Sequence, residues 1–385
     1  MKSKATEALF DWLTGQALPM WSAAGVDRNH GGFIEQIDPD GHKHADVRRA
    51  RLVARQIYAF RLAGTLGWTG PADQLARHGQ TALMRHHIGP DMVAVPRYFP
   101  GEDRTESGFD LYDQAFVLFG LSQVARLPGE TTAEGIALSI LAAMRIGWQH
   151  PGGGFGENRP ITAPLKANPH MHLFEAAQSW LEISENQAWH ALAAEIADLC
   201  LANFLDPETG ALHEFFDSEW QRLPNSAEHV IEPGHQSEWA WLLVRWYRRA
   251  GADRYLAAAR RLFAIAEDHG VHPDQGKLVN ELHSTMAMRD PRMRLWPQTE
   301  RIKALVVFCE EAENQQQRAE LEARLEQAVA GLLDYFRHPL PGSWWEHIGE
   351  DGSSCDEPAR ASSLYHILGA AAELTRYTGL NLARA

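Results

Sequence analysis

The sequence has few cysteines and no long apolar run, and each absence excludes a class of protein. Its 385 residues include 3 cysteines, Cys200, Cys309 and Cys355, which lie far apart and form no CxxC pair. Neither a disulfide framework nor a cysteine metal site is indicated, and a reducing cytoplasm is the expected location. No segment reaches 18 uninterrupted apolar residues, so no membrane span is expected, and the first residues do not resemble a secretion signal.

Positive charge is also scarce. Lys and Arg number 36 against 50 Asp and Glu, which gives a formal net charge of −14. Nucleic acids and anionic membranes are bound by basic surfaces, so neither is an expected partner. The remaining composition, 45% hydrophobic and 22% charged, is typical of a globular protein with a large core, and the length allows one domain or two.

The sequence does contain a repeat. The pattern Gly-x-apolar-x-Glu begins at Gly31, Gly153, Gly210 and Gly342, and a degenerate copy begins at Gly276, so successive starts differ by 122, 57, 66 and 66 residues. If the first interval holds two units of about 61 residues, a sixth copy should lie near residue 92, where the segment is turn-like but lacks the pattern. Six units are therefore predicted, one of them eroded.

Paired amphipathic helices are predicted between these turns. The expected pairs are 44–67 with 71–89, 110–127 with 132–148, 169–185 with 188–205, 236–251 with 253–270, 297–312 with 318–336, and 362–379 with the opening helix 4–21. The first helix of each pair is poorer in charge, which favours an inner position. We therefore predict an all-α (α/α)6 barrel, formed by one domain of residues 1–385. An open helical solenoid is the alternative, but neither terminal helix resembles a polar cap.

Ionisable or polar aromatic residues recur inside the less charged helices. Their positions, spaced by 57, 60, 63, 65 and 66 residues, are Arg55, Tyr112, His172, His235, Glu300 and His366. Each lies near the start of its helix, so all six should meet at one end of the barrel. Burying such groups costs free energy unless they are paired or used, so this end is the candidate site. The simpler alternative is that they are satisfied core residues, or in the case of Arg55 part of a solvated stripe.

Helical spacing adds neighbours to this set. Asn168 precedes His172 by four residues, Trp296 precedes Glu300 by four, and Glu238 follows His235 by three, so each pair shares one helix face. The His235/Glu238 pair is expected to fix an imidazole tautomer or to share a substrate contact. Helix N-termini favour neutral over cationic histidine, which suits a base near pH 7. Tyr112 and Trp296 are equally compatible with packing.

No metal or cofactor site is predicted. His170, His172 and Glu175 have the composition of a metal triad, but residues two apart on a helix point to different sides. A glycine-rich run at residues 152–158 lacks the strand and helix that a dinucleotide site requires.

The candidate residues suit a small neutral sugar. Glu238 and Glu300 could serve a glycoside hydrolase, but three histidines suit proton transfer near neutral pH better. A helical barrel that only binds sugar, without catalysis, would not need three histidines. One clearly placed cation, Arg55, argues against a phosphorylated substrate.

Several segments resemble, in order and spacing, the signature segments of the N-acylglucosamine 2-epimerase superfamily. They are Asn168-Pro-His-Met-His172-Leu-Phe-Glu175-Ala, Gly234-His235-Gln-Ser-Glu238-Trp, Trp296-Pro-Gln-Thr-Glu300 and Tyr365-His366, with Asp27 to Phe33 and Ala54 to Tyr58 similar as well. The resemblance covers nearly the whole chain. It implies an (α/α)6 barrel that works without a redox cofactor or a catalytic metal, as a monomer or homodimer.

The resemblance also implies roles. His235 and His366 would be the acid/base pair at the carbon next to the sugar carbonyl, and His172, supported by Asn168, would assist ring opening. Arg55 would stabilise the enediolate oxygen. Glu238 and Glu300 would hold hydroxyls or orient imidazoles, and Tyr112 and Trp296 would shape the ring site.

The expected substrate depends on which members of the superfamily these segments resemble most. Glu238-Trp239 and the single tryptophan before Pro297, where Leu295 precedes Trp296, are similar to the isomerase-like bacterial members. We therefore expect conversion of D-mannose to D-fructose, with N-acylglucosamine 2-epimerisation, or that of another aldose, as the alternative.

Overall fold

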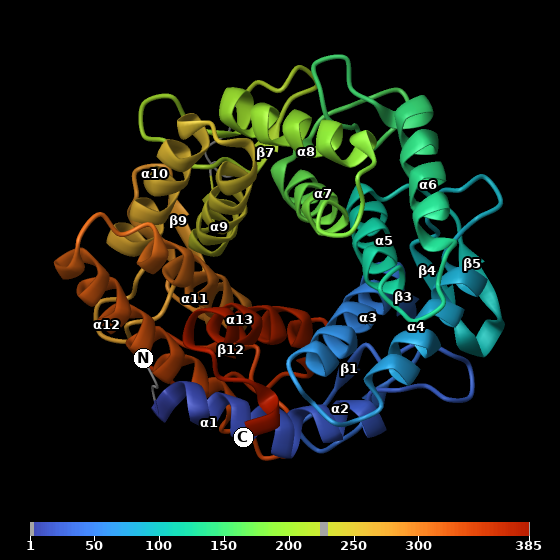
Figure 1. The fold of residues 1–385 in the computed structure, drawn as a ribbon, viewed down its shortest axis with the longest axis horizontal. Helices are drawn as coiled ribbons and strands as arrows, with labels where there is room; N and C mark the ends of the chain where they lie inside the picture. The colour runs from blue at the N-terminus through green and yellow to red at the C-terminus, as the bar shows by residue number, and fades with distance from the viewer. Residues whose placement is uncertain (1–3, 224–229, 385) are drawn as a thin grey trace.

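Two concentric rings of helices form the molecule (Figure 1), in a computed structural model that describes residues 4–223 and 230–384. The inner helices are α3 (Ala50–Thr65), α5 (Leu111–Val124), α7 (Ala167–Trp180), α9 (Pro233–Ala250), α11 (Leu295–Glu310) and α13 (Ser363–Thr378). The outer helices are α1 (Lys4–Trp12), which continues through the π-helical turn Leu13–Ala17 into α2 (Leu18–Ala24), then α4 (Ala72–His86), α6 (Ala133–Trp148), α8 (Gln187–Leu199), α10 (Asp253–His269) and α12 (Gln315–Leu332). With α1 and α2 taken as one, twelve helices lie in the described residues, as predicted.

The ring is closed. Each inner helix packs against the next, and α13 returns to pack against α3, while α1 packs against α12. Strand β1 (Gln36–Ile37) pairs with β13 (Ala359–Arg360), which joins the two ends of the chain a second time. The predicted (α/α)6 barrel is therefore confirmed, and the alternative of an open solenoid is wrong.

Burial separates the two rings as the charge pattern predicts. In α5, 13 of 14 residues are buried, because neighbouring inner helices and the outer ring cover it on all sides. In α12, only Leu321, Leu325, Ala328, Val329 and Leu332 are buried out of 18 residues, and their three- and four-residue spacing forms one apolar stripe. Helices with one apolar stripe stay outside, while helices apolar nearly all round stay inside.

Short antiparallel strands lie at the N-terminal ends of the inner helices. They are β2 (Lys43–His44), β3 (Arg48–Arg49), β4 (Arg97–Phe99), β5 (Arg104–Glu106), β6 (Leu165–Lys166), β7 (Phe215–Phe216), β8 (Val230–Ile231), β9 (Glu281–His283), β10 (Met288–Asp290), β11 (Met293–Arg294) and β12 (His347–Ile348), with β1 and β13. They pair in the orders β13-β1-β2, β3-β4-β5, β6-β7, β8-β9-β10 and β11-β12. These pairs tie the loops of successive units together around one mouth of the barrel.

The repeat turns are clamped to the inner helices by glutamine side chains. Gln236 accepts a hydrogen bond from Leu212 N (2.9 Å) and donates one to Leu212 O (3.3 Å). Gln298 does the same at Leu278, and Gln114 does the same at Ala94. The turn at Ala94, bridged to Ile88, is the eroded sixth copy that the spacing placed near residue 92.

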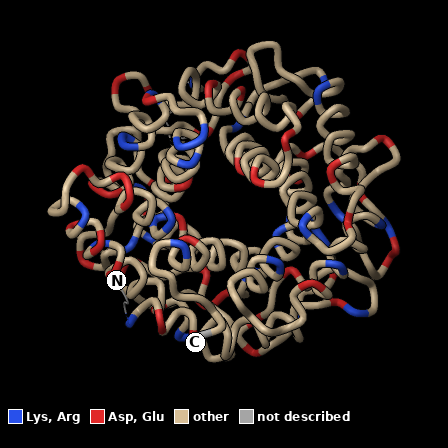
Figure 2. The backbone as a smooth tube through the Cα atoms, viewed as in Figure 1, with Lys and Arg blue, Asp and Glu red and all other residues tan. Residues whose placement is uncertain are grey.

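Acidic and basic residues are interspersed around the ring (Figure 2). Cys200, Cys309 and Cys355 are all free thiols. Among the residues that the structure describes, no helix combines the length and the apolar character needed to cross a membrane.

Candidate active site

A cavity of about 210 Å³ lies where the inner helices begin, at the mouth that carries the short strands. It is lined by Arg55, Tyr112, Asn168, His172, Glu232, His235, Glu238, Arg294, Trp296, Glu346, Arg360, Ser362, Ser363 and His366. The structure therefore brings eight of the nine predicted site residues to one cavity. The ninth, Glu300, is fully buried behind His366 and contacts it directly.

His366 is held as a neutral imidazole. Its Nδ1 lies 2.8 Å from Oε1 of Glu300, and Oε2 of Glu300 lies 2.5 Å from Nζ of Lys303. Burial lowers the pKa of His366 below its usual range and outweighs the opposing effect of Glu300. With Nδ1–H donating to the carboxylate, Nε2 is the ring nitrogen left to accept a proton, as a general base requires.

His235 has the opposite charge state. Its Nδ1 lies 2.8 Å from Oε1 of Glu214 and 3.9 Å from Oε2 of Glu232. Burial alone would lower the pKa of His235, but the carboxylates of Glu214 and Glu232 raise it to about 10. The imidazole is therefore protonated at neutral pH and can act as an acid.

The surroundings of His235 differ from those expected from its own helix. The start of α9 was expected to favour a neutral ring, but two carboxylates outweigh the partial charge of a helix end. The His235/Glu238 pair was expected to fix the tautomer or to share a substrate contact. Glu214, from the turn before the helix, holds Nδ1 in place of Glu238, and the shared substrate contact stays a prediction.

Trp296 lies between these two histidines. Its ring centroid is 5.0 Å from that of His235 and 5.7 Å from that of His366. A Cβ atom at Gly234 would fall 2.6 Å from the indole ring, so the glycine allows this close approach. The indole presents a flat apolar surface between an acid and a base, which suits the apolar face of a sugar ring.

His172 lies deeper, beside other glutamates. Its Nδ1 is 3.3 Å from Oε2 of Glu175 and 4.0 Å from Oε1 of Glu238. Burial lowers the pKa of His172 to about 4, so the ring is neutral. The expected support from Asn168 is not a hydrogen bond from its Oδ1 to His172. Asn168 Oδ1 is buried with no partner among the described residues, and Asn168 is one of the residues that line the cavity.

Arg55 is a buried cation held mainly by aromatic rings. Its guanidinium donates to Tyr112 Oη (2.6 Å) and lies 3.8 Å from the centroid of Phe116. In the part of the chain that the structure describes, no carboxylate forms an ion pair with Arg55, and its Nε has no partner. A buried guanidinium in this state is suited to stabilise an anionic oxygen that forms during a reaction.

Several residues that line the cavity, or that contact its lining as Glu214 contacts His235, were missed from the sequence. Glu214 and Glu346 belong to the repeat pattern, which was used only to count units. Arg294 and Arg360 lie on the short strands at the mouth, and Arg294 pairs with Glu232 at 2.7 Å. Three guanidinium groups line the cavity, so the expectation of a single well-placed cation is wrong.

Beneath the cavity, carboxylates gather around one ammonium group. Oxygens of Glu238 and Glu300 and a nitrogen of His366 lie within 4.8 Å of one another, and Glu175 is close to Glu238 through His172. Burial and the charge of Glu300 raise the pKa of Glu238 far above its usual range, despite Lys303. Glu238 is therefore a neutral acid, and Lys303 balances the charge of Glu300.

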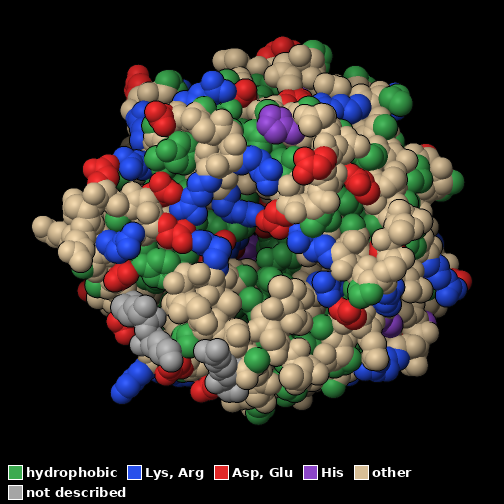
Figure 3. Space-filling model, in the orientation of Figure 1, with side chains coloured by type: hydrophobic (Ala, Val, Ile, Leu, Met, Phe, Trp, Pro, Cys, Tyr) green, Lys and Arg blue, Asp and Glu red, His purple; other side chains and the backbone are tan. Residues whose placement is uncertain are grey.

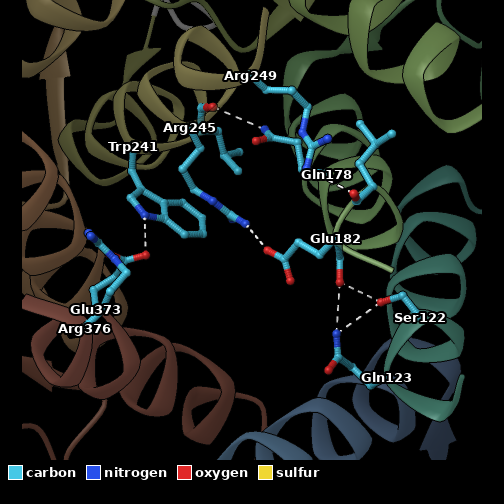
Figure 4. A network of polar contacts seen from close by, with 12 residues as sticks. Ser122, Gln123, Gln178, Glu182, Trp241, Arg245, Arg249, Glu373 and Arg376 are labelled. Carbon is cyan, nitrogen blue, oxygen red and sulfur yellow. Dashed lines mark hydrogen bonds and ion pairs between the residues drawn. The ribbon is translucent and has the colours of Figure 1, made fainter. Parts of the chain in front are cut away.

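A larger cavity, about 580 Å³, lies at the opposite mouth and contains no histidine. Charged side chains gather around the central hollow of the ring (Figure 3). Arg245 pairs with Glu182 at 2.6 Å, while Arg249 donates to the carbonyl of Leu181 at the end of an inner helix (Figure 4). These arginines are engaged in holding helix C-termini together. The smaller cavity is therefore the candidate active site.

Comparisons with known proteins agree with this geometry. The family model described as N-acylglucosamine 2-epimerase (GlcNAc 2-epimerase) matches residues 32–370. A protein of Rhizobium meliloti (strain 1021) named mannose-6-phosphate isomerase is 40% identical over 370 residues, 95% of either chain. A solved D-mannose isomerase superposes with a TM-score of 0.86 at 20% identity over 98% of this chain and 99% of that one.

A cellobiose 2-epimerase from Bacillus thermoamylovorans B4167 superposes with a TM-score of 0.84 at 19% identity, over 96% of this chain and 98% of that one. The barrel is therefore shared with proteins named as isomerases and as epimerases. With histidines and glutamates at one mouth of a closed helical ring and a family match across most of the sequence, the chain belongs to the N-acylglucosamine 2-epimerase family of sugar isomerases and epimerases.

Proposed function

We propose that the protein converts D-mannose to D-fructose by moving a proton at C2 of the open-chain sugar. The observation that carries this proposal is the pair of imidazoles on either side of Trp296, where His366 is neutral and His235 is protonated. A base and an acid on two sides of one ring site are what transfer through an enediolate needs. The name of the D-mannose isomerase structure supports the choice of sugar.

In the proposed reaction, the C2–H bond breaks and its proton passes to Nε2 of His366. Its electron pair forms the C1=C2 double bond, and the carbonyl oxygen on C1 takes the negative charge beside Arg55. Return of a proton to C1, with transfer of the proton on O2 to the negatively charged O1, gives the ketose. Addition of a proton to C2 from the opposite face, by His235, gives the 2-epimer instead.

The remaining predicted residues support these steps. His172, with Glu175, assists opening of the sugar ring at the anomeric oxygen. Asn168 and the neutral acid Glu238 bind hydroxyls, Tyr112 holds Arg55, and Trp296 stacks on the sugar. Glu300 acts on His366 and is not free to attack a glycosidic bond, since its oxygens face His366 and Lys303. This occupancy disfavours the hydrolase alternative.

Two alternatives have specific support. A 2-epimerase acting on an N-acylglucosamine or another aldose is compatible with the same acid and base, and with the cellobiose 2-epimerase likeness. A hexose 6-phosphate is favoured by Arg294 and Arg360 at the mouth and by the name of the Rhizobium relative.

Proton exchange in D2O tests the proposal. The protein is incubated with mannose, fructose, mannose 6-phosphate, N-acetylglucosamine and cellobiose, and deuterium at C2 and C1 is followed by NMR. We expect exchange and mannose–fructose interconversion. Exchange only at C2 with a 2-epimer as product would select the epimerase alternative, and no exchange with any sugar would rule out proton transfer on this set.

We further propose that residues 1–385 act as one domain in the cytoplasm, as a monomer or homodimer. The three free thiols support a reducing compartment. Size-exclusion chromatography with light scattering distinguishes the two oligomeric states.

A further inference from the structure

Lys303 is a buried ammonium group that the proposed reaction does not use. It lies on α11, three residues after Glu300, and its side chain is 2% exposed. Its Nζ is 2.5 Å from Oε2 of Glu300 and 3.7 Å from the ring centroid of Trp241. In sequence it interrupts the apolar run Ile302 to Phe308. Burying an ammonium group costs free energy unless it is well paired, so a charged Lys303 is maintained only by the groups around it.

The surroundings of Lys303 keep it charged. Burial lowers the pKa of Lys303, but the charge of the Glu300 carboxylate, with that of Glu175, outweighs burial and raises it above the usual range. Glu300 in turn forms an ion pair with Lys303 through Oε2 and contacts Nδ1 of His366 through Oε1. One carboxylate therefore links the ammonium to the proposed base.

Trp241 covers the other side of Lys303 and fixes its direction. The indole Nε1 donates to Glu373 Oε1 (3.0 Å), and Arg245 lies 4.6 Å from the same ring (Figure 4). This layer separates Lys303 from the cavity at the opposite mouth, so its charge acts on the glutamates of the active site.

We propose that Lys303 is a positioning residue for proton transfer: it keeps Glu300 ionised and oriented, and Glu300 then holds His366 with Nδ1 donating and Nε2 free. Without the ammonium, Glu300 can share or take the proton of His366, and the ring is no longer fixed as a base. This inference rests on the proposed role of His366.

Other charged and titratable groups face this cluster, and all stay unchanged in the test below. From α9 and α7 come His235, Glu238, His172 and Glu175, from α3 and α5 come Arg55, Tyr58 and Tyr112, and from α13 comes Tyr365.

Lys303→Met tests the proposal, because methionine retains much of the apolar stem and removes the charge. We expect kcat for C2 exchange to fall about 100-fold while KM changes less than about threefold. Loss of a nearby positive charge raises the pKa of a base, so the acid limb of the kcat profile should move to higher pH by about one pH unit. Lys303→Arg, which retains the charge, should leave that limb in place.

Arg301→Met is the matched control. Arg301 is buried on the same helix, but it pairs with Glu267 at 2.6 Å, away from the cavity. The Arg301→Met variant should be less stable than the wild type, but the acid limb of its kcat profile should stay at the wild-type pH. If Lys303→Met also loses only stability and keeps the wild-type limb, Lys303 is structural and the proposal is wrong.

A double-mutant cycle separates Lys303 from the other residues of the site. If Lys303 acts through Glu300, the combination of Lys303→Met with Glu300→Gln should be no slower than Glu300→Gln alone. Additive losses would contradict the inference. Should Lys303→Met not fold, Lys303→Gln takes its place. Absence of exchange in the wild-type protein would instead contradict the proposed function itself.

Discussion

Glu214 is a repeat residue that also sets the charge of a proposed catalytic group. Its equivalents bind the backbone or side chains at the starts of the inner helices: Glu35 accepts from Arg49 N at 2.7 Å, and Glu346 accepts from Ser363 Oγ at 2.9 Å. At Glu214 the same geometry meets a histidine, His235. One position of the repeat therefore holds backbone or side chains in some units and, in the proposed mechanism, sets the charge of the acid His235 in another.

The first prediction concerns the pH profile of Glu214→Gln. Carboxylates raise the pKa of His235 to about 10, so removal of one negative charge should lower it and move the basic limb of kcat/KM to lower pH. Glu157→Gln is the matched control, because Glu157 holds the same repeat position but pairs with Lys166 at 3.1 Å. A basic limb that stays in place in Glu214→Gln would show that His235 is not the acid.

The second prediction concerns Arg55. Arg55→Gln should lower kcat for C2 exchange by about 100- to 1,000-fold, because the enediolate oxygen loses a buried donor. The measurement is deuterium exchange at C2 under saturating sugar, with near-UV circular dichroism to confirm the fold. Arg61→Gln, on the outward part of the same helix, pairs with Asp73 and should keep wild-type exchange. If Arg55→Gln exchanges C2 as fast as the wild type, Arg55 does not stabilise the enediolate oxygen.

At this scale the sequence predicted which residues meet but not how they pair. A recurring polar residue near the start of each inner helix was sufficient to place Arg55, Tyr112 and the histidines at one mouth. The partner of His235 comes from a turn 21 residues earlier, and only the folded loop brings its carboxylate to Nδ1. Helical spacing favoured Glu238 because it describes neighbours on one helix and says nothing about preceding loops.

Among the elements, the turns before the inner helices are the most regular. The turn at Ala94 has lost the glycine and glutamate of the pattern but keeps its bridge to Ile88 and its clamp from Gln114. Glutamine at residues 114, 236 and 298 is thus a second repeat signal, offset from the first. Two-residue strands carry too little alternation to be predicted, whereas helices of 13 to 18 residues are long enough to be recognised, from an apolar stripe in the outer ring and from a long apolar run in the inner ring.

The third prediction tests a clamp. Gln114→Leu leaves the N–H and C=O of Ala94 without partners in a buried turn, at a cost of about 2 to 4 kcal/mol in the free energy of unfolding. Urea denaturation measures this value. Gln316→Leu, on the exposed face of α12, should change stability by less than about 0.5 kcal/mol. Equal stability of both variants would show that water replaces the clamp without loss.

For the whole molecule, closure of the ring depends on the first helix. Trp12 stacks on Phe336 with centroids 3.7 Å apart, and Trp21 stacks on Trp344 at 4.8 Å. Trp21 also donates to the carbonyl of Gly342, in the last copy of the repeat pattern. The opening segment thus supplies the outer helix of the last unit, which is why the predicted pairing of residues 4–21 with 362–379 closes six hairpins.

The fourth prediction follows from that closure. A variant that begins at Gly25 loses two buried tryptophans, each worth about 3 to 5 kcal/mol, and this sum is comparable to the whole stability of a typical protein. We expect it to lack a cooperative thermal transition, to bind a dye for exposed apolar surface, and to show no C2 exchange. Trp12→Phe, which retains an aromatic stack, should keep both the transition and the activity. In a solenoid, loss of a terminal helix leaves the other repeats folded. A cooperative transition and C2 exchange in the shortened variant would therefore contradict this prediction, because they would mean that the remaining hairpins fold and hold the active site without a closed ring.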